Sequence, residues 1–178
     1  NSRAIHDRDV VERNFPDQSA HNYHPFSQNR LTPKVEVIFR SRKPMAIFNQ
    51  EVLEEMKDLC DAIRSIVMSA GDQVYTYRDL CAKANGDCYV DGGFLLTDLF
   101  RNLLSLNKVT YPKWTPIDKP VDMRRLVGNV TVTNGILQSA NSITLGFPLR
   151  RDTPQMERLS LKWESHFLRF METVNCTK

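Results

Sequence analysis

Two of the four cysteines lie close together in the stretch TYRDLCAKANGDCYV, residues 76–90. Cys81 and Cys88 could hold a metal ion, act as a reactive dithiol or close a structural disulfide. Zinc needs four ligands at compact spacing, and no further cysteine or histidine lies nearby in the sequence. A thioredoxin-like pair has two residues between its cysteines, whereas this pair has six. The spacing therefore favours a Cys81–Cys88 disulfide, with two thiols in a cytosolic loop as the alternative.

The residues around this pair suit its closure. Thr76 can cap a short helix through Asp79, which would place Cys81 in the second turn of that helix. The step at residues 85–86, Asn-Gly, offers a turn with positive φ that can bring Cys88 back towards Cys81.

The two remaining cysteines allow a second bond. Four cysteines can pair in three ways, and once Cys81 and Cys88 are joined the second bond is Cys60–Cys176. Cys60 lies on the apolar face of an expected helix, so a buried thiol is the alternative for this residue.

Two Asn-x-Ser/Thr triplets indicate the compartment. They are NVT at Asn129 and NCT at Asn175. Each triplet alone is a weak signal, because such triplets arise by chance. Together with the cysteine loop they predict N-glycosylation at both asparagines and a domain that faces the extracellular or lumenal side.

Composition excludes several partners. The 178 residues are 41% hydrophobic and 25% charged, which is enough for one sizeable core. The net charge of +3 comes from 24 basic and 21 acidic residues without a run of one sign, so we expect neither nucleic acid nor an anionic membrane surface as a partner. Because no stretch approaches the ~20 apolar residues of a membrane span, we expect this segment itself to be soluble. Its start lacks an initiator Met and a signal-peptide core, as the interior of a longer chain would.

Hydrophobic periodicity predicts the first half of the fold. A short helix over 3–15 is stopped by Pro16, and a polar, turn-rich loop follows over 17–32. Residues 33–42 alternate as a strand. A helix that opens at Asn49 carries an apolar stripe at spacings of three and four: Val52, Met56, Leu59, Ile63 and Ile66.

The second half adds two helices and several strands. Residues 94–106 are apolar nearly all round, which predicts a largely buried helix. Residues 108–112 and 130–150 suit strands, with Asn-Gly at 134–135 as a hairpin turn and one apolar face: Ile143, Leu145, Phe147 and Leu149. The last helix starts at residue 152 or 153 and has the stripe Met156, Leu159, Trp163, Phe167 and Phe170.

These elements predict an α+β fold. Without residues 69–120 the order is β-α-β-α, most of a ferredoxin-like, split β-α-β unit with both helices on one face of the sheet. The core would comprise 33–68 and 121–178 of a single domain over 1–178. The helical, disulfide-stapled insertion would span 69–120, and a helix and loop would precede the core at 1–32. We expect the closing strand to lie just beyond the sequence or to come from another segment.

The sequence carries no visible catalytic motif. It has no Gly-rich phosphate loop, nucleophile elbow or His-Glu-x-x-His pattern, so we expect no enzyme activity, metal or cofactor. His21 and His24 fit a solvated loop, and His166 fits the edge of a core. A small secreted hydrolase-like enzyme centred on His166, or on the His21/His24 pair, is the alternative. A purely structural ectodomain is a third reading.

Five stretches, taken in order, resemble Patched-related membrane proteins. SRAIHDRDVVERNFP resembles the segment that follows the first membrane helix of that family, where a helix runs into Phe-Pro. YRDLCAKANGDCYV resembles its Asp-Leu-Cys … Gly-x-Cys block. VTYP and then LVGNVTV are similar to its Thr-Tyr-Pro strand and the stretch beyond. LQSANSITLGFPLR resembles the strand that leads to its last helix. The order covers nearly the whole chain and is closest to the nematode-like patched-related branch.

The resemblance implies a fold and a role. Patched-related proteins are similar to resistance-nodulation-division transporters and to the Niemann–Pick cholesterol transporter, with twelve membrane helices, a sterol-sensing domain and two ectodomains. The first ectodomain has a porter-type ferredoxin-like core. This chain would then be that ectodomain of a plasma-membrane protein. Its partners would be a sterol or other lipid, an extracellular protein ligand and the second ectodomain of the same chain. We expect partner contacts in the insertion at 69–120, and a hydrophobic groove between that insertion and the sheet would suit a sterol or acyl chain.

Overall fold

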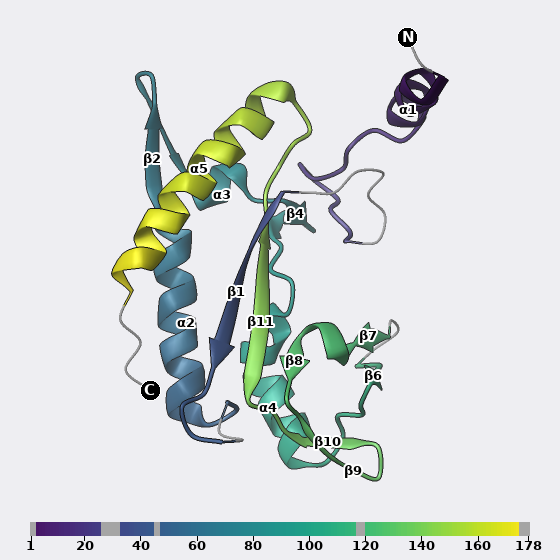
Figure 1. Cartoon of the computed structure of the whole chain (residues 1–178), viewed down its shortest axis with the longest axis vertical. Helices are drawn as coiled ribbons and strands as arrows, with labels where there is room; N and C mark the ends of the chain where they lie inside the picture. Colours follow the sequence, from purple (N-terminus) through teal and green to yellow (C-terminus); the bar gives the residue numbers. More distant parts are fainter. Residues whose placement is uncertain (1–2, 26–32, 45–46, 117–119, 175–178) are drawn as a thin grey trace. The chain divides into compact units, whose positions relative to one another are not determined.

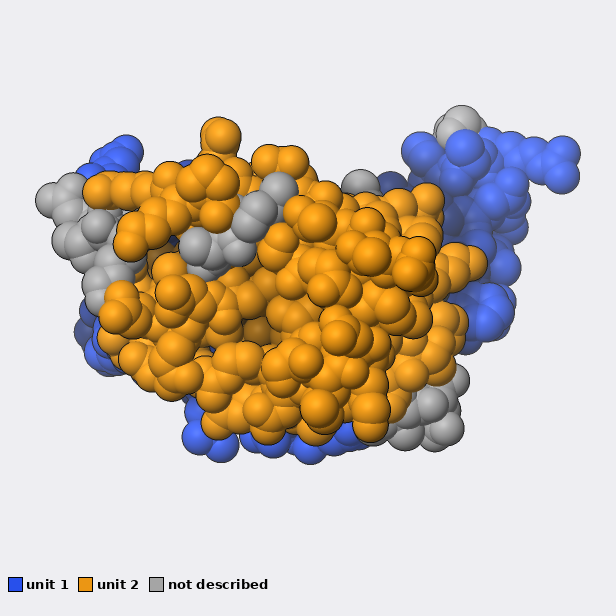
Figure 2. Space-filling model, turned by 90° about the horizontal axis from the view of Figure 1, so that it is seen from below, with its two compact units in different colours: residues 1–35, 63–89, 147–173 blue, residues 36–62, 90–146, 174–178 orange. Residues whose placement is uncertain are grey.

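A computed structural model describes residues 3–25, 33–44, 47–116 and 120–174. The fold mixes α-helices and β-strands, as expected (Figure 1). The chain divides into two compact units, coloured blue and orange in Figure 2. Unit 1 comprises 1–35, 63–89 and 147–173, and unit 2 comprises 36–62, 90–146 and 174–178. None of the helices within the described ranges is long and apolar enough to cross a bilayer.

The helices and strands are short, apart from two helices. Unit 1 contains α1 (Arg3–Asn14), β2 (Val67–Ala70), β3 (Gln73–Thr76), α3 (Tyr77–Leu80), β4 (Lys83–Ala84), β5 (Asp87–Cys88) and α5 (Pro154–Thr173). Unit 2 contains η1 (Gly93–Leu96), α4 (Asp98–Ser105), β6 (Lys113–Trp114), β7 (Val121–Asp122), η2 (Met123–Arg125), β8 (Val127–Gly128), β9 (Thr131–Thr133) and β10 (Ile136–Ser139). Three elements have residues in both units: β1 (Lys34–Arg40), α2 (Gln50–Arg64) and β11 (Ser142–Pro148).

The largest sheet has the order β1-β11-β8, and β1 runs beside β11 in Figure 1. The Leu149 amide donates to the Pro33 carbonyl at 2.8 Å, and the Ser41 amide donates to the Asn141 carbonyl at 3.0 Å. Because the register falls on one strand as it rises on the other, β1 and β11 are antiparallel. The two strands joined by a crossover helix in a β-α-β unit are parallel. The ferredoxin-like arrangement therefore stays a prediction, and β1 with β11 is not its parallel pair.

The apolar face expected on the last strand is confirmed. Ile143, Leu145, Phe147 and Leu149 are all fully buried. The Asn-Gly step at 134–135 also forms the expected turn, with positive φ at both residues, between the antiparallel strands β9 and β10.

The core of unit 1 is built on α5. Trp163 is fully buried and its ring centroid lies 5.2 Å from that of Tyr77 and 5.8 Å from that of Phe167. The Trp163 indole N–H donates to the Ile66 carbonyl at 3.4 Å, so the one polar atom of this side chain has a partner. Tyr77 in turn packs edge-on against Phe147, 5.9 Å away.

The apolar stripe expected on α2 is confirmed at Met56 and Ile63 and differs from the structure at the other positions. The residues buried on this helix are Leu53, Met56, Cys60 and Ile63. Val52 and Leu59 are only half-buried, so their assignment to the core was wrong. The apolar positions of this helix form a band wider than one row, and spacing alone does not show which row packs deepest.

The expectation of one buried helix over 94–106 is also wrong. Thr97 ends the turn η1 and caps α4, where its hydroxyl accepts from the Phe100 amide at 3.2 Å. Only Phe100 is buried within α4, whereas Leu99 is 67% exposed and Leu106 is 61% exposed. Phe100 instead belongs to an aromatic cluster with Phe94, Phe48 and Trp114.

Two smaller expectations differ from the structure. The capped helix ends at Leu80, so Cys81 terminates it rather than lying in a second turn. Residues 108–112 do not form a strand; Thr110 makes an isolated bridge to Ile136, and the strand β6 begins at Lys113. The peptide bond before Pro112 is cis.

Replacing Trp163 with alanine should destabilise the domain by about 3–5 kcal/mol, because a fully buried tryptophan leaves a cavity in the core of unit 1. Urea unfolding followed by circular dichroism measures this change. The matched control is Leu161→Ala on the same helix, where the side chain is 54% exposed and the expected change is below about 0.5 kcal/mol. Equal losses in the two variants would contradict the packing.

Candidate binding site

The disulfide-closed hairpin is the feature that organises unit 1. β4 and β5 pair with Lys83 opposite Cys88, and the turn between them has positive φ at Asn85 and Gly86. Cys81 and Cys88 are bonded, with their Cα atoms 5.4 Å apart. The disulfide expected from the sequence is therefore present.

The helix before the hairpin begins as expected. The backbone N–H and the hydroxyl of Thr76 both donate to one Asp79 carboxylate oxygen at 2.8 Å. The Thr76 backbone hydrogen bond is the main cause of a lowered pKa at Asp79. A carboxylate at this position also interacts favourably with the helix N-terminus, so the local sequence fixes the approach of the chain to Cys81.

Residues 80–83 hydrogen-bond to segments distant in the sequence. The Ala82 amide donates to the Pro148 carbonyl at 2.9 Å, and the Arg150 amide donates to the Leu80 carbonyl at 2.7 Å. On Lys83, the amide donates to the Ser19 carbonyl and the carbonyl accepts from the Tyr23 amide, each at 2.8 Å. The stretch 80–83 therefore joins the end of β11 to the segment that follows α1.

The segment 17–23 is held a second time, by side chains. Ser19 is fully buried, and its hydroxyl accepts from the Arg151 amide at 3.2 Å. The Asp17 carboxylate accepts from Arg151 Nε at 3.0 Å, and the Arg151 side chain is only 5% exposed. This hydrogen bond is charge-assisted and largely shielded from water. It therefore holds the segment 17–23 more firmly than an exposed surface ion pair would.

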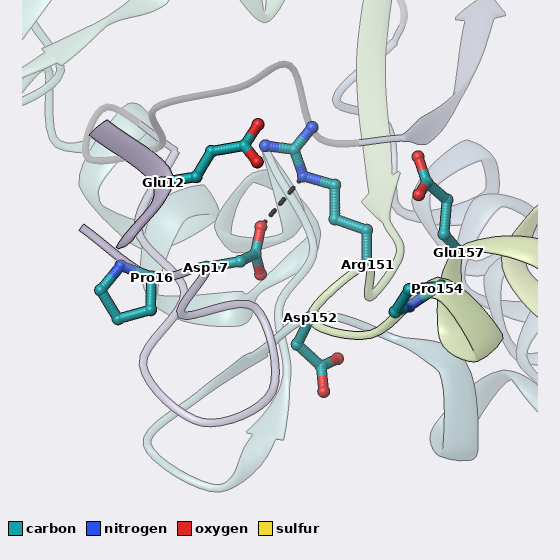
Figure 3. A pocket seen from close by; sticks show the side chains of 7 residues that line it. All are labelled: Glu12, Pro16, Asp17, Arg151, Asp152, Pro154 and Glu157. Carbon is teal, nitrogen blue, oxygen red and sulfur yellow. Dashed lines mark hydrogen bonds and ion pairs between the residues drawn. The ribbon is translucent and has the colours of Figure 1, made fainter. Parts of the chain in front are cut away.

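A pocket of about 290 Å³ opens beside this ion pair (Figure 3). Figure 3 shows Glu12 and Asp17 reaching towards the Arg151 guanidinium from one side, with Glu157 on the other side. The lining residues come from the end of α1, the segment after it and the start of α5: Glu12, Pro16, Asp17, Arg151, Asp152, Pro154 and Glu157. We call it the acidic pocket, because four of these side chains are carboxylates and one is basic.

One carboxylate of the acidic pocket, that of Asp152, is held by an ion pair. Arg150 donates to both oxygens of Asp152, at 2.8 and 2.9 Å. This hydrogen bonding is the main cause of the lowered pKa of Asp152, to which the nearby His21 charge also contributes, and it raises the pKa of Arg150. A carboxylate held ionised at neutral pH cannot act as a general acid there. The excess of carboxylates suits a cationic or hydrogen-bond-donating group rather than a fatty chain.

The structure places only some of the predicted site residues. Cys60 is buried, and Cys176 lies outside the described residues, so a Cys60–Cys176 bond stays a prediction. Asn129 is exposed, with φ of 50°, in the turn between β8 and β9. Asn175 also lies outside the described part of the chain.

The histidines singled out from the sequence lie on different segments, with His166 on α5 and His21 and His24 in the segment after α1. His166 lies on α5, where its Nδ1 is 3.0 Å from the carbonyl of Lys162 one turn earlier. His21 is exposed and close enough to Asp152 to influence its pKa. Within the described ranges, no group of three or more His, Cys, Asp or Glu side chains is arranged to hold a metal ion.

The sequence did not reveal the acidic pocket. Asp17 and Arg151 are 134 positions apart, and neither belongs to a periodic pattern or motif. The one local signal is the Arg-Arg-Asp run at 150–152, which precedes the helix that Pro154 opens. Charges at a helix start are common, so this run does not point to a partner at residue 17.

Comparisons with known proteins do not supply a family. No model of a known protein family matches the chain, and no curated protein matches it at a significant level. What the fold and the site define is a mixed α/β protein with a disulfide-closed hairpin and a polar pocket beside it. The functional argument therefore starts from those two features.

Removing the disulfide with the double substitution Cys81→Ala/Cys88→Ala should cost about 2–3 kcal/mol of unfolding free energy, because a cross-link over a short loop restricts the unfolded chain. The amides of Lys83 and Tyr23 should then exchange with deuterium faster, since the hairpin positions both. Hydrogen exchange read by NMR checks this. The amide of Leu137 in unit 2, bonded to the Val109 carbonyl, is the internal control for local loosening. Unchanged exchange at Lys83 and Tyr23 would contradict the role of the disulfide.

Stability should depend on pH through Asp152. Its folded-state pKa lies below the ordinary 3.8, so its contribution is present above that pH and is lost as the pH falls through the folded pKa. Asp152→Asn should cost about 1 kcal/mol at pH 7, and the gap to the wild type should close below pH 3.8. Urea unfolding over this range measures the gap. Asp58→Asn, an exposed carboxylate on α2, should give no such trend.

Proposed function

We propose that this chain is the first extracellular domain of a Patched-like, multi-pass membrane protein. In this proposal the domain faces the outside of the plasma membrane or an oxidising lumen. It presents a binding surface or shapes a conduit for a sterol or another lipid, and it meets the second ectodomain of the same chain. It has no catalytic role of its own.

The Cys81–Cys88 disulfide is the observation that carries the proposal. A disulfide persists in oxidising compartments and is compatible with an extracellular location. This one also closes the Asp-Leu-Cys … Gly-x-Cys stretch on which the family resemblance depends. The hairpin is an integral part of unit 1, because Ala82 hydrogen-bonds to the end of β11 and Lys83 hydrogen-bonds to the segment after α1.

The position of Asn129 gives independent support. A glycan needs an asparagine that is accessible and lies outside a packed ladder. Asn129 is exposed, in a turn, with a positive φ that asparagine tolerates better than most residues. The triplet that begins there ends at the exposed Thr131.

The insertion at 69–120 remains the proposed place for partner contacts. Leu99 on α4 is exposed, and so is Leu106, which caps the C-terminal end of this helix. These two leucines are the apolar side chains that a partner would meet there. The acidic pocket in unit 1 is polar, so a sterol or acyl chain would have to bind elsewhere. The ferredoxin-like porter core also belongs to the proposal, with the constraint that β1 and β11 form an antiparallel pair of its sheet.

The test is expression of the chain through a eukaryotic secretory pathway. Intact mass under non-reducing conditions should show Cys81 and Cys88 joined, and peptide mapping should find a glycan at Asn129. Thr131→Ala should remove that glycan and leave the disulfide intact. The matched control is Thr133→Ala, which changes an exposed threonine of the same strand outside the triplet.

Two results would overturn the proposal. One is a secreted protein with both thiols reactive towards a maleimide before any reductant is added. The other is an unmodified Asn129 in protein that has passed through the secretory pathway. Organic extraction of the purified domain, followed by lipid mass spectrometry, then separates a lipid-binding ectodomain from a purely structural one.

A further inference from the structure

Unit 1 contains a second pocket, of about 440 Å³, which shares no residue with the acidic pocket. It is lined by Arg64, Tyr77, Arg78, Asp87 and Cys88. Its size falls within the usual range for small-molecule sites. We call it the arginine pocket, because two of its five lining side chains are guanidinium groups.

The walls of the arginine pocket are fixed by the core and by the disulfide. Tyr77 is 1% exposed and is packed between Trp163 and Phe147. It precedes Arg78 in the single-turn helix α3, so the backbone that carries Arg78 cannot shift freely. On the strand β5, the disulfide to Cys81 fixes Cys88, and Asp87 is the residue before it. The backbone around the pocket is therefore held in place, whereas the side chains of Arg64, Arg78 and Asp87 are exposed and would become ordered when a ligand binds.

Two charged side chains of this pocket, those of Arg78 and Asp87, are not used by the described part of the fold. Within the part of the chain that the structure describes, the Arg78 side chain makes no hydrogen bond or ion pair, and neither does that of Asp87. The two line one pocket without pairing with each other. A guanidinium fork and a carboxylate both retain their full hydrogen-bonding capacity there.

This pattern of charge selects a chemical class. Arginine matches the geometry of phosphate and carboxylate oxygens, and two arginines make the anionic end of a ligand the stronger contact. A bare anion would leave Asp87 as a repulsive neighbour. A ligand with an ammonium or similar donor a few ångströms from its anionic group would contact both the arginines and Asp87. We propose that the arginine pocket binds a small zwitterion, with its phosphate or carboxylate on Arg78 and Arg64 and its cationic end on Asp87.

O-phosphoethanolamine, inorganic phosphate and ethanolamine are suitable probes, because they present both charges, the anion alone and the cation alone. Titration calorimetry on the intact chain should give saturable binding of O-phosphoethanolamine at millimolar concentrations. Phosphate should bind about tenfold more weakly, since it forfeits one charge-assisted contact, and ethanolamine should bind more weakly still.

Three variants make the assignment specific. Arg78→Ala should weaken both O-phosphoethanolamine and phosphate about tenfold or more. Asp87→Asn should remove the preference for O-phosphoethanolamine over phosphate while phosphate binding persists. Arg158→Ala, at an exposed arginine of α5 outside the pocket, should match the wild type. Unchanged circular dichroism in all three shows that the fold is intact.

The proposal is overturned if the wild type shows no saturable binding of O-phosphoethanolamine. It is also overturned if Arg78→Ala binds like the wild type, or if Arg158→Ala weakens binding as much as Arg78→Ala does. A vesicle-binding experiment decides whether the zwitterion is a lipid headgroup or a free metabolite. Phosphatidylethanolamine vesicles that sediment the wild type but not Arg78→Ala assign the site to a lipid headgroup. Binding of the soluble compound alone assigns it to a free metabolite.

Discussion

The hydrogen bonds of residues 80–83 are the constraint on which unit 1 depends. This stretch is too short to form a sheet of its own. It pairs with the end of β11 through Leu80 and Ala82, and with the segment after α1 through Lys83. The disulfide fixes the return of the chain from Asn85-Gly86, so Lys83 and Cys88 stay opposite each other. Without that register, the segment after α1 would lose its backbone partner at Lys83, whereas β11 would still pair with β1 and β8.

Both pockets of unit 1 inherit their geometry from this stretch. The acidic pocket depends on Asp17 and Arg151, which lie next to residues bonded to the hairpin. The arginine pocket uses Asp87 and Cys88 of the hairpin itself. In the acidic pocket, Arg151 is paired with Asp17, and the remaining charged side chains are carboxylates. In the arginine pocket, the side chains of Arg78 and Asp87 make no hydrogen bond or ion pair within the described residues. The same stretch therefore supports two pockets that differ in charge.

Local chemistry was predictable from the sequence, and long-range pairing was not. The cap at Thr76, the turn at Asn85-Gly86 and the disulfide all involve residues within about a dozen positions, where propensity and spacing are informative. On α2, Met56 and Ile63 were predicted correctly as core residues and Val52 and Leu59 were not, because periodicity gives a face but not its deepest row. The helix over 94–106 was predicted as continuous and buried from its apolar content alone, and the Thr97 cap that divides it was missed. The Asp17–Arg151 pair and the antiparallel sense of β1 and β11 have no signature in one sequence, because nothing local records them.

The separation between partners bears on how the chain acquires its structure during synthesis. Ser19 and Pro33 near one end bind Arg151 and Leu149 near the other, across more than a hundred intervening residues. A ribosome adds roughly 5–20 residues per second, so these early segments wait for many seconds with their backbone groups facing water. Unit 1 cannot be completed in the order in which it is made. Its early segments are exposed to chaperones before its last helix arrives.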